Sequence, residues 1–277
     1  MPIDMGVRGQ HSRFPQEDFF GLGRFGRRED RTDYLLESTK AGAGLQWEPA
    51  KPMRLAVRLS YVSPSIGSGT DSRFLSTPEV FDPAELPGFE AQPDFLRSDA
   101  SLVLDWRDQP QHPHAGGQVG LQVSHSRDQD LDAFSFHRLA IDVQHYVPLP
   151  DRYRTVALRA SALLTAPQSG QQVPFYYQPT LGGSQALRGF REFRFQDRNS
   201  LLLTAEYRWE ASWLLDGALF VDAGKVALDR RDLTFRDLEV SYGLGFRVHS
   251  NSAFVARLDL AFSREGFIPL LRFEHVF

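Results

Sequence analysis

The carboxyl-terminal stretch FIPLLRFEHVF, from Phe267 to Phe277, alternates between two faces of a strand and ends on an aromatic residue. Successive side chains of a β-strand point to opposite faces. Phe267, Phe273 and Phe277 therefore share an apolar face, and Arg272 lies on the other. Because the ends of soluble domains usually fray and carry polar residues, a strand that ends on phenylalanine indicates the closing strand of a membrane barrel, with Phe273 and Phe277 as its terminal signal.

The same alternation recurs upstream in segments of roughly ten residues, which is the length that a tilted strand needs to cross a bilayer and is more than soluble sheets usually have. An apolar face opposes a polar one in residues 55–61, 100–107, 201–209, 239–248 and 253–262. Short connections such as Glu48 to Lys51 alternate with long polar ones, namely Ser63 to Ser98, Ala166 to Asn199 and Lys225 to Asp237. The pattern predicts an all-β, antiparallel transmembrane barrel of about twelve strands, with short periplasmic turns and long extracellular loops.

Composition narrows the class of protein without deciding it. The chain has 277 residues, no cysteine and a net charge of −4. It lacks a run of about 18 apolar residues, which excludes a transmembrane helix, whereas a barrel's alternating lipid face is hidden in hydropathy averages. The near-neutral net charge gives no sign of the basic surface that binds nucleic acid. No repeat, linker or low-complexity tract divides the chain, so residues 1–277 are expected to form one barrel domain.

Along each strand, successive side chains are expected to point alternately towards lipid and towards a water-filled lumen. On this interpretation Leu258 faces lipid and its neighbour Asp259 faces the lumen. Arginine should therefore be costly at Leu258, by about 2 to 4 kcal/mol near the midplane, and tolerated at Asp259.

The most specific motif lies in the segment QPTLGGSQALRGFREFRFQDRNS, Gln178 to Ser200, in a long loop. Gly189 allows either a positive φ or a close backbone approach. Either conformation would place Arg188 at a sharp tip, with Phe190 packed beside it. The sequence thus predicts a loop tip formed by Arg188, Gly189 and Phe190.

A tip arginine that is buried needs a carboxylate or an aromatic face, because an unpaired buried charge is costly. Glu206 falls on the polar face of its strand, and Phe220 and Asp222 share the polar face of theirs. We therefore expect Glu206, Phe220 and Asp222 to point into the lumen and anchor Arg188.

The loop LGG…LRGF, the strand FVDAG at 220–224, the strand GLGFRV at 243–248 and the terminal phenylalanine together resemble a known family. It is the outer-membrane assembly and translocation superfamily of BamA, TamA and the two-partner secretion transporters, whose barrel is also called the bacterial surface antigen domain. The resemblance is strongest from Pro179 to Phe277. It implies that the RGF tip of the sixth extracellular loop folds into the lumen and locks onto inward residues of the following strands.

The chain departs from this family pattern at its amino end. The family barrel has sixteen strands. This sequence predicts five strands after the loop and about seven before it, so about four strands of the family barrel have no counterpart. Periplasmic POTRA domains and a signal peptide are also not seen after Met1. We therefore interpret the sequence as an amino-terminally truncated member of the family. Asp4 to Phe14 alternates poorly, so we expect its seam with the terminal strand to be open or poorly paired.

Other chemistries are weakly supported. Glu206 and Asp222 could form an acid–base pair, but paired charges are common in barrel lumens, so we expect no catalytic residues and no enzyme. The histidines lack the spacing of metal ligands, so neither a metal site nor a cofactor is expected.

The leading functional hypothesis is a protein of the bacterial outer membrane that assists insertion or translocation. Its partners would be outer-membrane lipid and unfolded outer-membrane or secreted client proteins, which pair with an exposed strand edge at the seam. The alternative is a passive or structural barrel or pore without assembly activity. A soluble β-sandwich that folds without detergent is the remaining possibility.

Overall fold

The computed structural model describes residues 3–151, 153–249 and 254–273, which form one antiparallel sheet of twelve strands. Each strand pairs with its neighbour along the chain, except that β7 pairs with β10 because a two-stranded sheet, β8 with β9, lies between them in the sequence. The strands are β1 (Ile3–Phe19), β2 (Thr32–Ala50), β3 (Met53–Ser68), β4 (Phe95–Asp105), β5 (Gly116–Asp128), β6 (Phe136–Pro148), β7 (Arg154–Pro167), β8 (Thr180–Leu181), β9 (Phe195–Gln196), β10 (Asn199–Glu210), β11 (Leu215–Ala227), β12 (Glu239–His249), β13 (Phe254–Ser263) and β14 (Gly266–Arg272). The described helices are short: α1 (Thr77–Val80) and four single-turn 3₁₀ segments, Arg28–Asp30, Pro83–Glu85, Phe175–Tyr177 and Arg230–Asp232.

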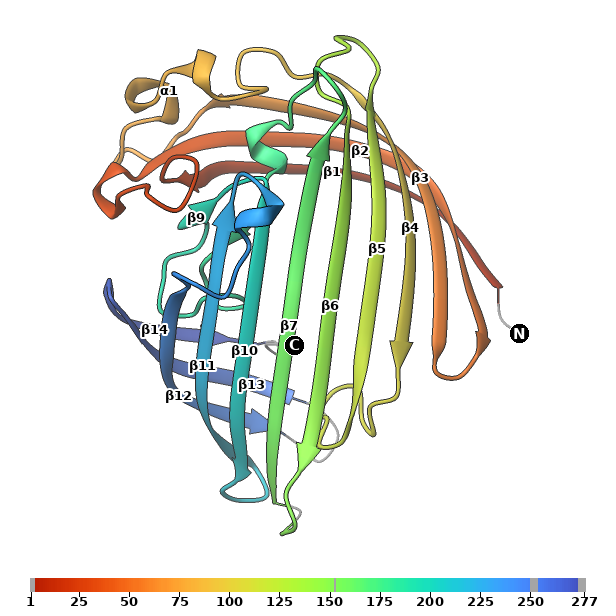
Figure 1. Cartoon of the computed structure of the whole chain (residues 1–277), viewed down its shortest axis with the longest axis vertical. Helices are drawn as coiled ribbons and strands as arrows, with labels where there is room; N and C mark the ends of the chain where they lie inside the picture. The colour runs from red at the N-terminus through yellow and green to blue at the C-terminus, as the bar shows by residue number, and fades with distance from the viewer. Residues whose placement is uncertain (1–2, 152, 250–253, 274–277) are drawn as a thin grey trace.

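The sheet curls into an incomplete barrel (Figure 1). β1 and β14 are its two edges, and within the described residues no ladder joins them. The expected open seam is therefore confirmed. The strand expected from Phe267 to Phe277 is seen as β14 only to Arg272, and Phe277 lies outside the described residues.

The first strand is more regular than its sequence suggests. β1 pairs with β2 from Ile3↔Trp47 to Phe19↔Thr32, with a single irregularity between Phe14 and Glu17. The ladder is made by backbone groups, so poor side-chain alternation does not prevent it. One edge of β1 is thus paired with β2 along its length, and within the described residues no strand pairs with the other edge.

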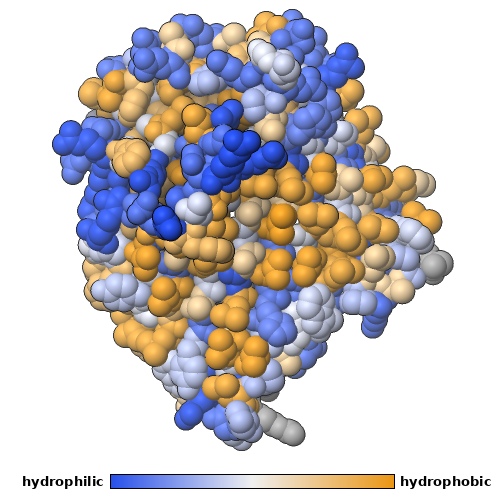
Figure 2. Space-filling view, viewed as in Figure 1, coloured by the Kyte–Doolittle hydropathy of each residue, from blue (hydrophilic) through white to orange (hydrophobic). Residues whose placement is uncertain are grey.

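Side chains on the two faces of the sheet differ as expected for a barrel in lipid. On β12, Tyr242 and Phe246 are exposed on the outer face, whereas Ser241 and Arg247 are buried on the inner one. Figure 2 shows hydrophobic residues covering much of the outer surface of the strands, with hydrophilic residues gathered towards the loop end. No helix among the described residues is long and apolar enough to span a bilayer.

The connections are short at one end of the barrel and longer at the other, but one expected boundary is wrong. The loop predicted from Ser63 to Ser98 is shorter, because β3 continues to Ser68 and β4 begins at Phe95. The extension of β3 pairs with β2, including Pro64↔Ser38. Its Ser-Pro-Ser composition is typical of a loop, so no local signal predicted the extension of this hairpin.

The long loops fold over the mouth of the barrel rather than into solvent. Two aromatic clusters pack beneath them: one contains Phe19, Tyr34, Leu86, Phe175 and Tyr176, and the other contains Val62, Phe95, Phe136 and Val173. These clusters fix where the loop of residues 168–198 enters the lumen.

At the opposite end, the turn of residues 106–115 reaches across the lumen. His112 Nε2 lies 2.7 Å from Oδ2 of Asp216, an inward residue at the start of β11. His114 Nε2 lies 3.0 Å from His112 Nδ1, and Thr155 of β7 lies 3.4 Å from His114 Nδ1. β6, β7 and β10 separate this turn from β11 in the sheet, so the histidines join strands that are not neighbours.

The turn should loosen in acid. Burial and the neighbouring His112 lower the pKa of His114 from its ordinary 6.5. A depressed histidine pKa means that the unfolded turn binds a proton more readily, so stability present above about pH 6.5 is lost as the pH falls towards the folded-state pKa. The protection factors of the amides of Trp106 and Asp108, which donate to the carbonyls of Gly117 and Ala115, should fall below about pH 6.5.

The variant His114→Gln should remove this loss of protection while leaving the fold intact. If the protection factors of these amides instead stay constant or rise in acid, the prediction would be wrong.

Candidate functional site

The loop that carries the LGG and LRGF motifs folds back on itself. Gly182 and Gly183 have φ values of +123° and +82°, a region that favours glycine. A Cβ at Gly182 would lie 2.0 Å from the carbonyl oxygen of Arg191. The Gly183 amide donates to the Phe190 carbonyl at 3.0 Å. The paired glycines thus close the loop and aim its tip into the lumen.

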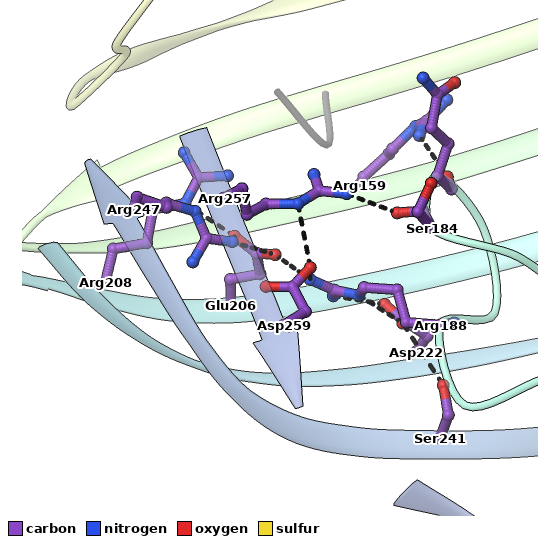
Figure 3. A network of polar contacts seen from close by, with 11 residues as sticks. Arg159, Ser184, Arg188, Glu206, Arg208, Asp222, Ser241, Arg247, Arg257 and Asp259 are labelled. Atoms are coloured by element: carbon purple, nitrogen blue, oxygen red, sulfur yellow. Dashed lines mark hydrogen bonds and ion pairs between the residues drawn. The ribbon is translucent and has the colours of Figure 1, made fainter. Parts of the chain in front are cut away.

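The structure brings the predicted tip arginine and its three anchors together, and Figure 3 shows Arg188 beside two of them, Glu206 and Asp222. The Nε and Nη2 atoms of Arg188 each donate to Asp222 at 2.7 Å, and Nη1 donates to Glu206 at 2.5 Å. The guanidinium carbon lies 3.5 Å from the centre of the Phe220 ring. Arg188 and Asp222 are fully buried. The fork of Arg188 is therefore held on two sides by carboxylates and on one face by an aromatic ring.

Gly189 allows the backbone of the loop tip to lie close to the backbone of β13. A Cβ there would lie 2.7 Å from the Phe262 carbonyl oxygen and 2.8 Å from the Ser263 Cβ. Ser263 Oγ donates to the Gly189 carbonyl at 2.6 Å. Of the two explanations for this glycine, the structure shows the close approach, because Gly189 has no positive φ.

Phe190 anchors the tip on apolar side chains. It is fully buried, and its ring centre lies 5.1 Å from that of Phe195. Both belong to a cluster with Leu181, Leu187, Leu202 and Val226. The tip is thus held by a charged contact on one side and by apolar packing on the other.

Sequence reasoning missed the rest of the network. Glu206 also accepts hydrogen bonds from Arg208 at 2.8 Å and from Arg247 at 2.9 Å. Arg247 and Arg208 lie on the polar faces of their strands, so alternation placed them in the lumen without indicating which residues they would meet.

Two further residues of β13 complete the network. Arg257 Nε lies 3.0 Å from Asp259 Oδ2, and Arg257 Nη2 donates to the Ser184 carbonyl of the loop at 2.8 Å. Arg188 Nη1 lies 3.6 Å from Asp259 Oδ2. The expectation that Asp259 tolerates arginine is therefore wrong, because a new cation there would face both Arg257 and Arg188 in a buried setting.

Phe273 follows β14, is 77% exposed and takes no part in this network. Phe277 lies outside the described residues. The lumen network instead joins β10, β11, β12 and β13 to the loop. Such an arrangement offers ion pairs that lock a loop in place.

Comparison with known proteins gives the family. The model of the Omp85 superfamily domain matches residues 26–266, most of the chain. The chain belongs to the Omp85 superfamily. The stretch matched spans all the strands that hold the buried network, from the loop tip to β13.

The fold of this Omp85 domain is also seen among solved structures. It is similar to the crystal structure of BamA from Haemophilus ducreyi lacking POTRA domains 1–3, with a TM-score of 0.68 and 13% sequence identity. The match covers 97% of this chain and 62% of that one. No match was found among curated proteins. At this identity the likeness concerns the fold alone.

Proposed function

We propose that this Omp85 barrel acts at the bacterial outer membrane in the insertion or translocation of proteins, by pairing with β-strands of unfolded clients at its open seam. The observation that carries this proposal is that, within the described residues, no ladder joins β1 to β14. On β1 the outward side chains Met5 and Val7 are 81% and 89% exposed. A long unpaired edge presents a row of backbone donors and acceptors that templates another strand.

Contacts at the loop end of the barrel hold the β1–β2 loop beside the β13–β14 turn, although within the described residues β1 and β14 are not paired. Arg194 pairs with Glu265 in the β13–β14 turn at 2.8 Å and donates to the Gly26 carbonyl in the β1–β2 loop at 2.7 Å. Arg28 donates to the Glu265 carbonyl at 2.7 Å. These contacts hold the loop end of the seam together, so a client strand would enter from the turn end.

The locked loop gives the second half of the barrel its rigidity. Breaking a buried ion pair leaves an uncompensated charge, which is costly, and such pairs tie the loop to β10, β11 and β13. We infer that the lock keeps this wall fixed while the wall formed by β1 to β3 accommodates a strand.

A crosslinking experiment tests the proposal. Photo-crosslinking residues are placed at Val7 on β1 and, as a control, at Val123 on β5; both side chains are exposed, but β5 has neighbours on both edges. An unfolded outer-membrane protein added to the barrel in vesicles should crosslink to position 7 and not to position 123. Equal or absent crosslinking at both positions would favour the passive or structural barrel.

A further inference from the structure

A groove of about 810 Å³ lies on the outer face of the sheet and reaches across to β5. Over β4 its floor is formed by two small residues, Ser98 and Ala100. Register places larger side chains on both sides of this floor: Val57 and Leu59 of β3, and Val123 and His125 of β5. Since neighbouring strands lie about 4.8 Å apart, the two walls stand about 10 Å apart at the backbone. The groove therefore has room for a hydrocarbon chain.

Three basic side chains gather where the groove approaches the loop end of the barrel. His125 lines the groove itself. Its register partner on β6 is His137, and the two rings stack with centres 4.4 Å apart and planes inclined by 15°. Arg127 lies two residues further along the same face of β5 and is exposed. We call Arg127, His125 and His137 the basic cluster.

The basic cluster has no counter-charge among the residues that the structure describes. The charged groups that act on His125 are His137 and Arg127, both basic. Two other arginines at the loop end are neutralised: Arg13 pairs with Glu37 at 2.7 Å, and Arg264 pairs with Glu239 at 2.6 Å. The basic cluster thus offers a guanidinium and two imidazoles to an anion from outside the protein.

The level of the basic cluster in the barrel is that of the lipid headgroups. His125 lies close to the end of β5 at Asp128, and His137 is the second residue of β6. Tyr61 is exposed on the same face, in the register row that also contains Leu96 and Arg127. Tyrosine is enriched at membrane–water interfaces. The groove continues from this level towards the middle of the strands, where Ala100 and Val123 lie.

We propose that this surface binds a phosphate-bearing lipid of the outer leaflet. The phosphate lies on the basic cluster, because guanidinium and imidazole N–H groups donate well to phosphate oxygens. One acyl chain lies in the groove over β4. The inference requires only that this face of the barrel meets lipid, so it does not depend on client strands pairing at the seam.

The experiment measures quenching of tryptophan fluorescence by lipids with brominated acyl chains. Tryptophan replaces Leu139, which pairs with Val123 beside the groove. The matched control is tryptophan at Leu203 on β10, because both leucines are half-buried and lie on the outer face. Signal from the four native tryptophans is subtracted by measuring the unsubstituted chain.

Phosphatidylcholine vesicles contain a small fraction of either brominated phosphatidic acid or brominated phosphatidylcholine. At position 139 the affinity for phosphatidic acid should exceed that for phosphatidylcholine at least about fivefold, because each cation at a lipid surface adds about that factor. At position 203 the two lipids should quench equally.

Substitutions separate the two parts of the site. Neutralising the basic cluster with His125→Gln, Arg127→Gln and His137→Gln should abolish the preference, and each single substitution should reduce it in part. Ala100→Phe fills the floor of the groove without removing a charge, and it should also reduce the preference. His145→Gln is the matched control, since it removes an exposed histidine from the turn end of β6, and the preference should survive it.

Four results would overturn the proposal or one of its parts. Equal quenching by the two lipids at position 139 of the unsubstituted cluster would overturn the lipid site. A preference that persists in the triple variant and in each single variant would overturn the role of the basic cluster. A preference unchanged by Ala100→Phe would overturn the groove as the site of the acyl chain. Loss of the preference in excess inorganic phosphate would show that free phosphate, rather than a lipid, is the ligand.

Discussion

Replacing Arg188 by alanine should release the loop of residues 168–198 from the lumen while the sheet remains folded. The substitution leaves Glu206 and Asp222 without the cation that joins them. Removing one partner of a buried ion pair typically costs about 3 to 5 kcal/mol, because the remaining charge stays desolvated. Here the free energy that is lost is the free energy of docking the loop in the lumen. Protease nicking between residues 168 and 198 should rise steeply, at unchanged heat-modifiable mobility of the barrel on gels.

Two further variants sharpen this prediction. Arg188→Lys keeps the charge but loses the planar fork that reaches both carboxylates, so it should restore protection only in part. Arg191→Ala removes an exposed arginine from the same loop and should change nothing. Unchanged nicking in Arg188→Ala would show that apolar packing of Phe190 alone holds the loop.

Arginine at Ala160 should destabilise the barrel by about 2 to 4 kcal/mol, whereas arginine at the adjacent Ser161 should be mild. Both residues lie near the middle of β7 and are small. Ala160 is exposed on the outer face, where an arginine would meet lipid. Ser161 faces the wet lumen, where an arginine keeps its hydration, although its register partner Asp142 already contacts Arg159 at 2.7 Å.

The measurement is the free energy of unfolding by denaturant in lipid vesicles. Ser161 is the suitable lumen-facing test position, whereas Asp259 is not, because Asp259 belongs to the buried ion network. Equal losses at positions 160 and 161 would contradict a lipid face opposite a wet lumen, and would favour the soluble sandwich.

The lock at the loop tip was predictable because its members carry local signals. A glycine next to an arginine in a long loop indicates a tight tip, and alternation along β10 and β11 places Glu206, Phe220 and Asp222 on the inner face. Packing decided the role of Gly189, since only the structure shows that the tip touches the backbone of Phe262.

What the sequence by itself determined is the face on which each side chain lies, because a period of two is a property of the isolated strand. It also determined the all-β class and the loop motif. The tertiary structure alone decided which inward residues meet across the lumen, as Arg257 and Asp259 meet the loop, and His112 meets Asp216. Such pairs depend on the curvature of the whole sheet and on where it stops. The same holds for the regular pairing of β1 with β2, because backbone hydrogen bonds make a strand whether or not its side chains alternate.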